Sequence, residues 1–223
     1  IFFAKGERLP VDTISLISAR SDSGQYIRLT SDIANAEISG QYRVSELGYI
    51  IENNIDPYFN ITTSTKARNV QPYNIRFYAD VTNSPFLSAF LPGVDILAPL
   101  HTEGTIVSGQ GINAVLNTES LKFNNNQLTG LNMKVATTTN GLEVTGNLDH
   151  LVSGTFDIYS TEFVAIINNN IIDFKVGVDD KASKDKYNLA GRLTQPSKGT
   201  YIISLTPGSL LLNYEQWDVS PGN

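Results

Sequence analysis

The sequence has no cysteine, one methionine, one tryptophan and two histidines. Without cysteine there is no disulfide bond and no thiolate metal ligand, and two histidines are too few for a metal site built from imidazoles. We therefore expect neither a metal nor a cofactor. No apolar run approaches the roughly 18 residues of a membrane-spanning helix, and residues 1–10 lack the basic start and apolar core of a signal peptide. Either the protein is cytosolic or its targeting segment lies outside this sequence, and the absence of an initiator methionine favours the second reading.

Charge is also sparse. Charged residues make up 17% of the chain against 41% hydrophobic residues, a balance typical of a folded protein and not of a disordered one. The net charge is −6, and the 16 lysines and arginines are scattered along the sequence. A nucleic acid is therefore not the expected partner. The 223 residues suffice for one large all-β domain or two small ones, and length does not choose between them.

What the sequence has in abundance is alternation of apolar and polar residues, the pattern of half-buried strands. In segment 73–81, Ile75 and Phe77 fall on one face, whereas Asn74 and Arg76 fall on the other. The same pattern predicts strands at 36–44, 142–148 and 187–193, with further candidates at 14–18, 26–30, 105–116, 121–123, 131–135, 155–158, 171–178 and 201–205.

Turn-forming stretches such as "SDSGQ", "NNNQ" and "TTTNG" separate these segments. Short strands therefore recur about every ten residues, without the crossover helices of an α/β protein. This spacing predicts an all-β fold, either a sandwich, a barrel or a β-solenoid.

Two segments have helical spacing instead. Residues 45–59 place apolar side chains on one side of a helix that Ser45 could cap and Pro57 would end. Residues 84–91 begin with a Ser-Pro pair suited to a helix start and are followed by a Pro-Gly stop. One amphipathic helix and one short helix are predicted.

Three strands share a glycine in the apolar register, in "ISGQY", "VTGNL" and "LAGRL". These glycines, Gly40, Gly146 and Gly191, either mark places where a curved sheet tolerates no side chain or are ordinary strand glycines. The recurrence is too irregular for a fixed-period repeat and favours a quasi-repetitive architecture.

The sequence carries no P-loop, nucleophile elbow, zinc-protease motif or dinucleotide fingerprint. Glycine-rich residues 109–114 lie within an alternating pattern and are interpreted as part of a strand. Asp179 and Asp180 lie in a charged stretch typical of a solvated loop, and His101 and His150 are expected to be exposed or hydrogen-bonded. We therefore expect no enzymatic activity.

The apolar faces of the strands are compatible with two structures. In a closed sandwich these side chains would fill the core, whereas in one long curved sheet they would line an open groove. Periodicity cannot separate the two, because both remove the same face from water.

Four stretches, in order, resemble a known family: "LTSDIANAEISGQYRVSELGYIIENNIDPYF", "FYADVTNSPFLSAFLPGVDI", "GLEVTGNL" and "SLTPGSLLLNYEQWDVSPGN". Together they resemble the TamB proteins, which are related to the AsmA-like group, over roughly residues 25–223. The last stretch resembles a family element in which a Leu-rich strand leads through a turn to Trp-x-Val.

This resemblance implies an elongated curved β-sheet groove, a β-taco or open β-solenoid with an apolar interior. Residues 1–223 would be a single segment of such a groove, cut from a longer chain, with a helical insertion at about 45–59 and a short helix at about 84–91. It implies a periplasmic location, with an inner-membrane anchor outside this sequence, and a TamA-type (Omp85-type) outer-membrane barrel as partner. The implied role in outer-membrane biogenesis is phospholipid transport between the two membranes, in what the family calls a translocation and assembly module.

Residues at alternating positions are the candidates for a lipid-binding groove, and the helix at 45–59 could cap or plug it. The alternatives are an assembly factor for outer-membrane proteins, which would use exposed sheet edges, and a closed β-sandwich without a ligand. An open groove could also associate with a second copy, groove to groove. The candidate groove residues are Ile38, Tyr42, Val44, Ile75, Phe77, Val81, Phe123, Met133, Val144, Leu148, Phe156, Phe174, Leu189, Leu193 and Ile203.

Overall fold

The computed structural model describes residues 2–4, 7–9, 13–22, 24–59, 69–83, 93–96, 98–197 and 200–218. The elements are β1 (Phe2–Ala4), β2 (Glu7–Leu9), β3 (Ile14–Ser21), β4 (Gly24–Ser31), β5 (Ala34–Gln41), the 3-10 helix η1 (Val44–Glu46), α1 (Leu47–Ile55), β6 (Asn74–Val81), β7 (Val94–Ile96), β8 (Leu100–Val107), β9 (Gly111–Phe123), β10 (Asn126–Thr138), β11 (Gly141–Ser153), β12 (Phe156–Asn168), β13 (Ile171–Asp179), β14 (Asp185–Ser197), β15 (Thr200–Leu205), β16 (Leu210–Leu212) and β17 (Glu215–Trp217).

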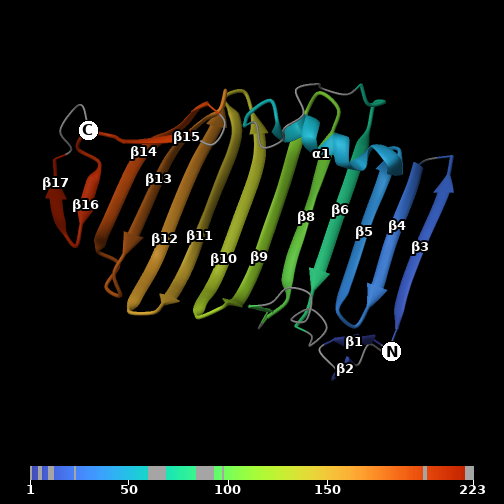
Figure 1. Ribbon diagram of the computed structural model, residues 1–223, viewed down its shortest axis with the longest axis horizontal. Helices are drawn as coiled ribbons and strands as arrows, with labels where there is room; N and C mark the ends of the chain where they lie inside the picture. Colours follow the sequence, from blue (N-terminus) through green and yellow to red (C-terminus); the bar gives the residue numbers. More distant parts are fainter. Residues whose placement is uncertain are drawn as a thin grey trace.

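Within the described residues, β3 to β17 form one long, curved antiparallel sheet of 15 strands, and β1 and β2 form a separate pair. Thirteen of these strands follow one another as an up-and-down meander from β3 at one edge to β17 at the other, while β7 pairs with β9 and β15 with β14 outside this order (Figure 1). In this described part of the chain, β3 pairs with β4 alone and β17 with β16 alone. The sheet is therefore open, which confirms the predicted all-β groove and excludes the closed sandwich.

The central strands are longer than the sequence spacing suggested. Four consecutive strands, β9 to β12, have 13 residues each, about 43 Å of extended chain. The predicted single strand at 105–116 was wrong, because β8 ends at Val107 and β9 begins at Gly111 after a turn. The turn keeps the apolar residues on even positions, so alternation alone conceals it.

Helix α1 lies across the strand ends near β5, β6 and β8 (Figure 1). Its Ile50 is completely buried and packs in a cluster with Ile75 of β6 and Ile106 of β8. The helix is shorter than the predicted 45–59, because regular α-helix stops at Ile55 before Pro57. Ser45 lies inside η1 and is not the cap of either helix. The predicted short helix at 84–91 lies outside the described residues.

The pairing register shows which residues share one side of the sheet. We call the side that carries Ile75 and the residues in register with it the apolar face. Residues directly opposite each other in a ladder project to the same side. A row of such partners can be followed through twelve successive strands. From β3 to β15 it consists of Ser18, Ile27, Ile38, Phe77, Gly104, Ala114, Val135, Val144, Ala165, Phe174, Gly191 and Leu205.

A line of irregular positions crosses β9 to β12. The ladders skip Glu119, Gly130, Asp149 and Ser160, and two of these have a positive φ, Gly130 at 66° and Ser160 at 37°. On β12 the register shifts between Tyr159 and Thr161, as in a β-bulge. At the bulge, two residues of β12 lie opposite one residue of β13. Ile158 and Phe156 therefore lie on the apolar face, the same side as Val178. In register with them, Leu121, Phe123, Leu128 and Leu151 continue the apolar face.

Three glycines in the apolar register have the same specific cause: a phenylalanine of the neighbouring strand lies over each of them. A Cβ placed on Gly146 would lie 2.4 Å from Cζ of Phe163. The corresponding distances are 2.7 Å for Gly104 and Phe77, and 3.0 Å for Gly191 and Phe174. Gly40 differs, because its φ is 129° and a Cβ would lie 2.0 Å from the carbonyl oxygen of Asn74. The phenylalanine rings therefore lie along the sheet, so they project little from the apolar face.

We expect Gly146→Ala to destabilise the protein by about 1–3 kcal/mol, because its methyl group would overlap both Phe163 and the carbonyl oxygen of Asn132, 2.6 Å away. The control is Gly177→Ala on β13, where the added Cβ would have nothing within 4 Å and which should change stability by less than about 0.5 kcal/mol. Urea unfolding of both variants measures the difference. Equal stability of the two would contradict the Phe-over-Gly packing.

Candidate functional site

The apolar face is only partly covered. Within the described residues, only seven hydrophobic side chains are buried: Ile33, Ile50, Ile75, Ile106, Leu142, Leu148 and Val178. The accessible surface of the chain is 14203 Å², against about 10,000 Å² for a compact monomer of its 24.4 kDa mass. Because the sheet is a single layer, most of its apolar residues are half-buried by their neighbours and remain open to a ligand on one side.

Most of the predicted groove residues lie together on this face. Register aligns Val144 with Val135 and Ala165, and Met133 with Leu116 and Gly146. Following the ladders in the same way places on the apolar face Ile38, Ile75, Phe77, Val81, Met133, Val144, Leu148, Phe174, Leu189, Leu193 and Ile203.

Four predicted residues lie elsewhere or need a further step. Tyr42 follows β5 and packs against the Ile50 cluster, so the helix region contains it. Val44 begins η1 and is 50% exposed, so its expected place in a strand was wrong. Phe123 and Phe156 lie on the apolar face only beyond the bulge line, where they are 46% and 67% exposed.

Sequence reasoning missed other residues of the apolar face. Leu116, Phe163 and Val176 occupy the same rows as the predicted ones. Leu128 and Leu151 lie beyond the bulge line and are half-buried. Within β9 the apolar residues change from even to odd sequence positions. This change was the sequence signal for the bulge line, and it does not mark the end of a strand.

Helix α1 covers one end of the apolar face. Besides Ile50, it buries Asn54, whose side-chain amide donates to the hydroxyl oxygen of Tyr73 at 2.7 Å and to the carbonyl oxygen of Ile50 at 2.7 Å. Beyond the helix, the backbone N–H of Asn170 in the β12–β13 turn donates to the carbonyl oxygen of Tyr58. The helix thus caps the ends of several strands and leaves the middle of the apolar face uncovered.

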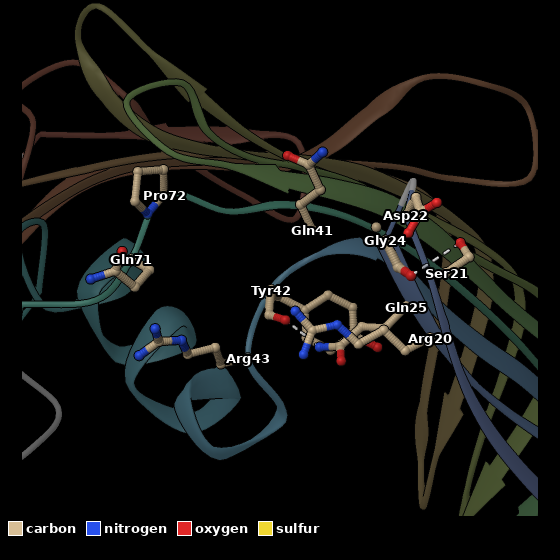
Figure 2. Close-up of a pocket in the computed structure, with 11 residues that line it drawn as sticks. Arg20, Ser21, Asp22, Gly24, Gln25, Gln41, Tyr42, Arg43, Gln71 and Pro72 are labelled. Atoms are coloured by element: carbon tan, nitrogen blue, oxygen red, sulfur yellow. Dashed lines mark hydrogen bonds between the residues drawn. The ribbon is translucent and has the colours of Figure 1, made fainter.

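A polar pocket lies where the helix begins. Its cavity volume is about 250 Å³, and Arg20, Gln25, Tyr42, Arg43 and Gln71 are among the residues that line it (Figure 2). Gln25 belongs to the apolar face by register with Gly40. At this corner the face therefore ends in polar and cationic side chains.

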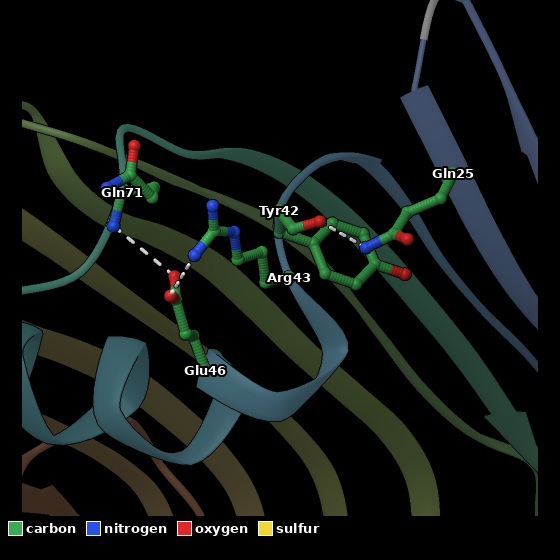
Figure 3. Close-up of polar contacts among 5 residues, drawn as sticks. All are labelled: Gln25, Tyr42, Arg43, Glu46 and Gln71. Carbon is green, nitrogen blue, oxygen red and sulfur yellow. Dashed lines mark hydrogen bonds and ion pairs between the residues drawn. The ribbon is translucent and has the colours of Figure 1, made fainter.

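The contacts in this pocket fasten the helix to the edge of the sheet (Figure 3). The side-chain amide of Gln25 donates to the carbonyl oxygen of Tyr42. Glu46, at the start of α1, accepts the backbone N–H of Gln71 at 3.3 Å and the Arg43 guanidinium at 3.4 Å. These bonds join β4, the helix start and the segment leading into β6.

The opposite face of the sheet is mostly polar and carries ion pairs between strands. Arg28 and Glu37 approach to 2.6 Å, as do Arg192 and Asp173, and each pair occupies opposed register positions. Both histidines are hydrogen-bonded, as expected: Nδ1 of His101 lies 2.6 Å from Asp80 and Nε2 of His150 lies 2.5 Å from Asp157. Exposed pairs of this kind add little stability, and they keep this face in water.

Asp179 and Asp180 have structural surroundings that differ. The pKa of Asp179 is raised, first by burial and then by its hydrogen bond with Asp185. The pKa of Asp180 is lowered by the hydroxyl of Tyr214, which donates to it at 2.7 Å, and by two turn N–H groups. Asp180 therefore shapes the β13–β14 turn, as its expected place in a loop implied.

In the described ranges, no three His, Asp or Glu side chains come together in a way that could hold a metal ion. Neither helix in the same ranges has the length and apolar character needed to cross a bilayer.

Comparison with known proteins identifies no relative. No protein-family model, curated protein or solved structure matches the chain. The TamB resemblance therefore remains a sequence-based expectation.

Proposed function

We propose that the protein binds the acyl chains of phospholipids along its apolar face and so carries lipids between membranes, without catalysing a reaction. The observation that carries this proposal is the continuity of the apolar face across an open, single-layer sheet. A closed core of the same composition would leave no room for a ligand.

The physical reason is the free energy of apolar transfer. Each methylene of an acyl chain costs about 0.8 kcal/mol when exposed to water, so a trough that shields several methylenes lowers the barrier to leaving a membrane. Because phenylalanine rings lie over glycines, the side chains on the floor of this trough project little from the sheet. The polar opposite face, with its ion pairs, keeps the complex in water.

From the TamB resemblance we further propose a periplasmic location and a TamA-type barrel as partner. These proposals depend on sequence motifs alone. In this setting helix α1 would limit the lipid path, because it covers the strand ends around Ile75 and Ile106. Acyl chains would then lie toward the middle of the strands, near Leu116 and Met133.

Titration with a fluorescent fatty acid tests the proposal. We expect saturable binding with an increase in fluorescence, because the fluorophore leaves water for the apolar face. Absence of binding by the folded protein would contradict the proposed function.

A second candidate, assembly of outer-membrane proteins, is favoured by the edge strand β3. Ile14, Leu16 and Ile17 on this strand are 46%, 69% and 48% exposed. In the described part of the chain nothing pairs with its outer edge, so an extended peptide could add to the sheet there. A strand-forming peptide that binds without displacing the fatty acid would support this second function.

A further inference from the structure

One end of the sheet carries exposed aromatic side chains next to lysines. In an antiparallel meander, the β9–β10, β11–β12, β13–β14 and β16–β17 turns lie at the same end of the strands, as Figure 1 shows. We call the residues at this end the hairpin-tip surface. It consists of Phe123, Val152, Phe156, Lys181, Lys184 and Tyr214.

The aromatic residues of the hairpin-tip surface are unusually open to solvent. Phe156 is 67% exposed, Phe123 is 46% exposed and Tyr214 is 41% exposed. Phe123 and Phe156 lie in one cross-strand row, through Asn126 and Ser153. This is the last row before the hairpin turns, and the two phenylalanines at its ends carry the apolar face to its boundary.

Two lysines at the same end of the sheet stand over tyrosine rings, and Tyr159 lies on the opposite face of β12 from Phe156. Nζ of Lys181 lies 4.9 Å from the ring centre of Tyr159, and Nζ of Lys184 lies 4.8 Å from that of Tyr214. Such contacts hold an ammonium group in place.

Two acidic groups near the lysines, Asp157 and Asp180, also accept hydrogen bonds from other partners. Asp157 accepts from the Tyr159 hydroxyl at 2.7 Å and contacts His150 at 2.5 Å, while Lys181 lies 3.9 Å away. Asp180 accepts the Tyr214 hydroxyl and the N–H groups of Ala182 and Lys184.

We propose that the hairpin-tip surface docks onto the surface of a lipid bilayer, with Phe123 and Phe156 entering the boundary between headgroups and acyl chains and the lysines contacting phosphates. A bilayer surface offers both partners at once, an apolar layer beneath a layer of anionic groups. The inference rests on the proposed function and adds where lipid would enter the apolar face.

Flotation with vesicles tests this docking. The vesicles are phosphatidylcholine alone, or phosphatidylcholine mixed with phosphatidylglycerol. We expect Phe123→Ser/Phe156→Ser to lower the bound fraction at least tenfold on both. The matched control is Ile17→Ser/Ile202→Ser, which changes two residues that are 48% and 50% exposed on the opposite face and should still bind.

The lysines are tested by Lys181→Gln/Lys184→Gln. We expect this variant to lose about fivefold per lysine on the phosphatidylglycerol vesicles alone, while fatty acid uptake in solution stays unchanged. No flotation of the wild type, or an equal loss in the Ile17/Ile202 control, would overturn the inference.

The experiments can reject the proposed function and the docking surface independently of each other. Fatty acid binding without flotation rejects the docking surface and keeps the proposed function. Flotation that depends on the two phenylalanines, without fatty acid binding, rejects the proposed function and keeps the docking surface. Circular dichroism of each variant shows whether a loss of binding comes from loss of the sheet.

Discussion

Replacing Val144 by aspartate is expected to weaken fatty acid binding about 30-fold. Val144 lies in the middle of the apolar face, with Val135 and Ala165 beside it on the neighbouring strands. A carboxylate there retains its water, so an acyl chain loses contact over two or three methylenes. At about 0.8 kcal/mol per methylene this loss is about 2 kcal/mol, and every 1.4 kcal/mol is a factor of ten.

The control for this variant is Asn147→Asp, three residues further along β11. Asn147 is exposed on the polar face, paired with Asn132 and Glu162, and its replacement adds the same charge. Titration with the fluorescent fatty acid should show normal affinity for this control. If both variants bind as the wild type does, the acyl chain does not lie across the middle of the apolar face.

Ile50→Ala is expected to lower the free energy of unfolding by about 2–5 kcal/mol, the largest stability effect that we anticipate for a single side chain. Ile50 is fully buried, and it joins helix α1 to Ile75 and Ile106 of the sheet. Its truncation removes apolar contacts and leaves a cavity beneath the helix.

The neighbouring Ile51 provides the control, since it is 48% exposed. Ile51→Ala should change the stability by less than about 0.5 kcal/mol. Urea unfolding followed by circular dichroism measures both. Equal midpoints for the two variants would mean that helix α1 is not held by Ile50 and does not cap the apolar face in solution.

Local alternation predicted much of the sheet, because it depends on a strand having one dry side and one wet side. Segment 73–81 has this alternation, and strand β6 covers 74–81. Alternation failed where a turn preserved its parity, between Val107 and Gly111, and where bulges reversed it, around Ser160. Neither feature changes the composition of the segment.

Other features depend on which strands are neighbours, and sequence periodicity carries no such information. The open form of the sheet is one example, since a closed sandwich would show the same alternation. The covering of Gly146 by Phe163 is another, because these residues meet only in the observed register. The candidate groove residues were predicted as one face correctly where the strands were regular, whereas Val44 was misplaced because η1 begins there.

The most direct test of the proposed lipid-binding face is photolabelling with a fatty acid that carries a diazirine near the end of its chain. Labelled residues are then identified by mass spectrometry of peptides. We expect the label on residues of the apolar face such as Met133, Val144 and Leu189, with an excess of unlabelled fatty acid suppressing it. Labelling that falls mainly on the polar face, at residues such as Thr145 and Lys175, would contradict lipid binding along the apolar face.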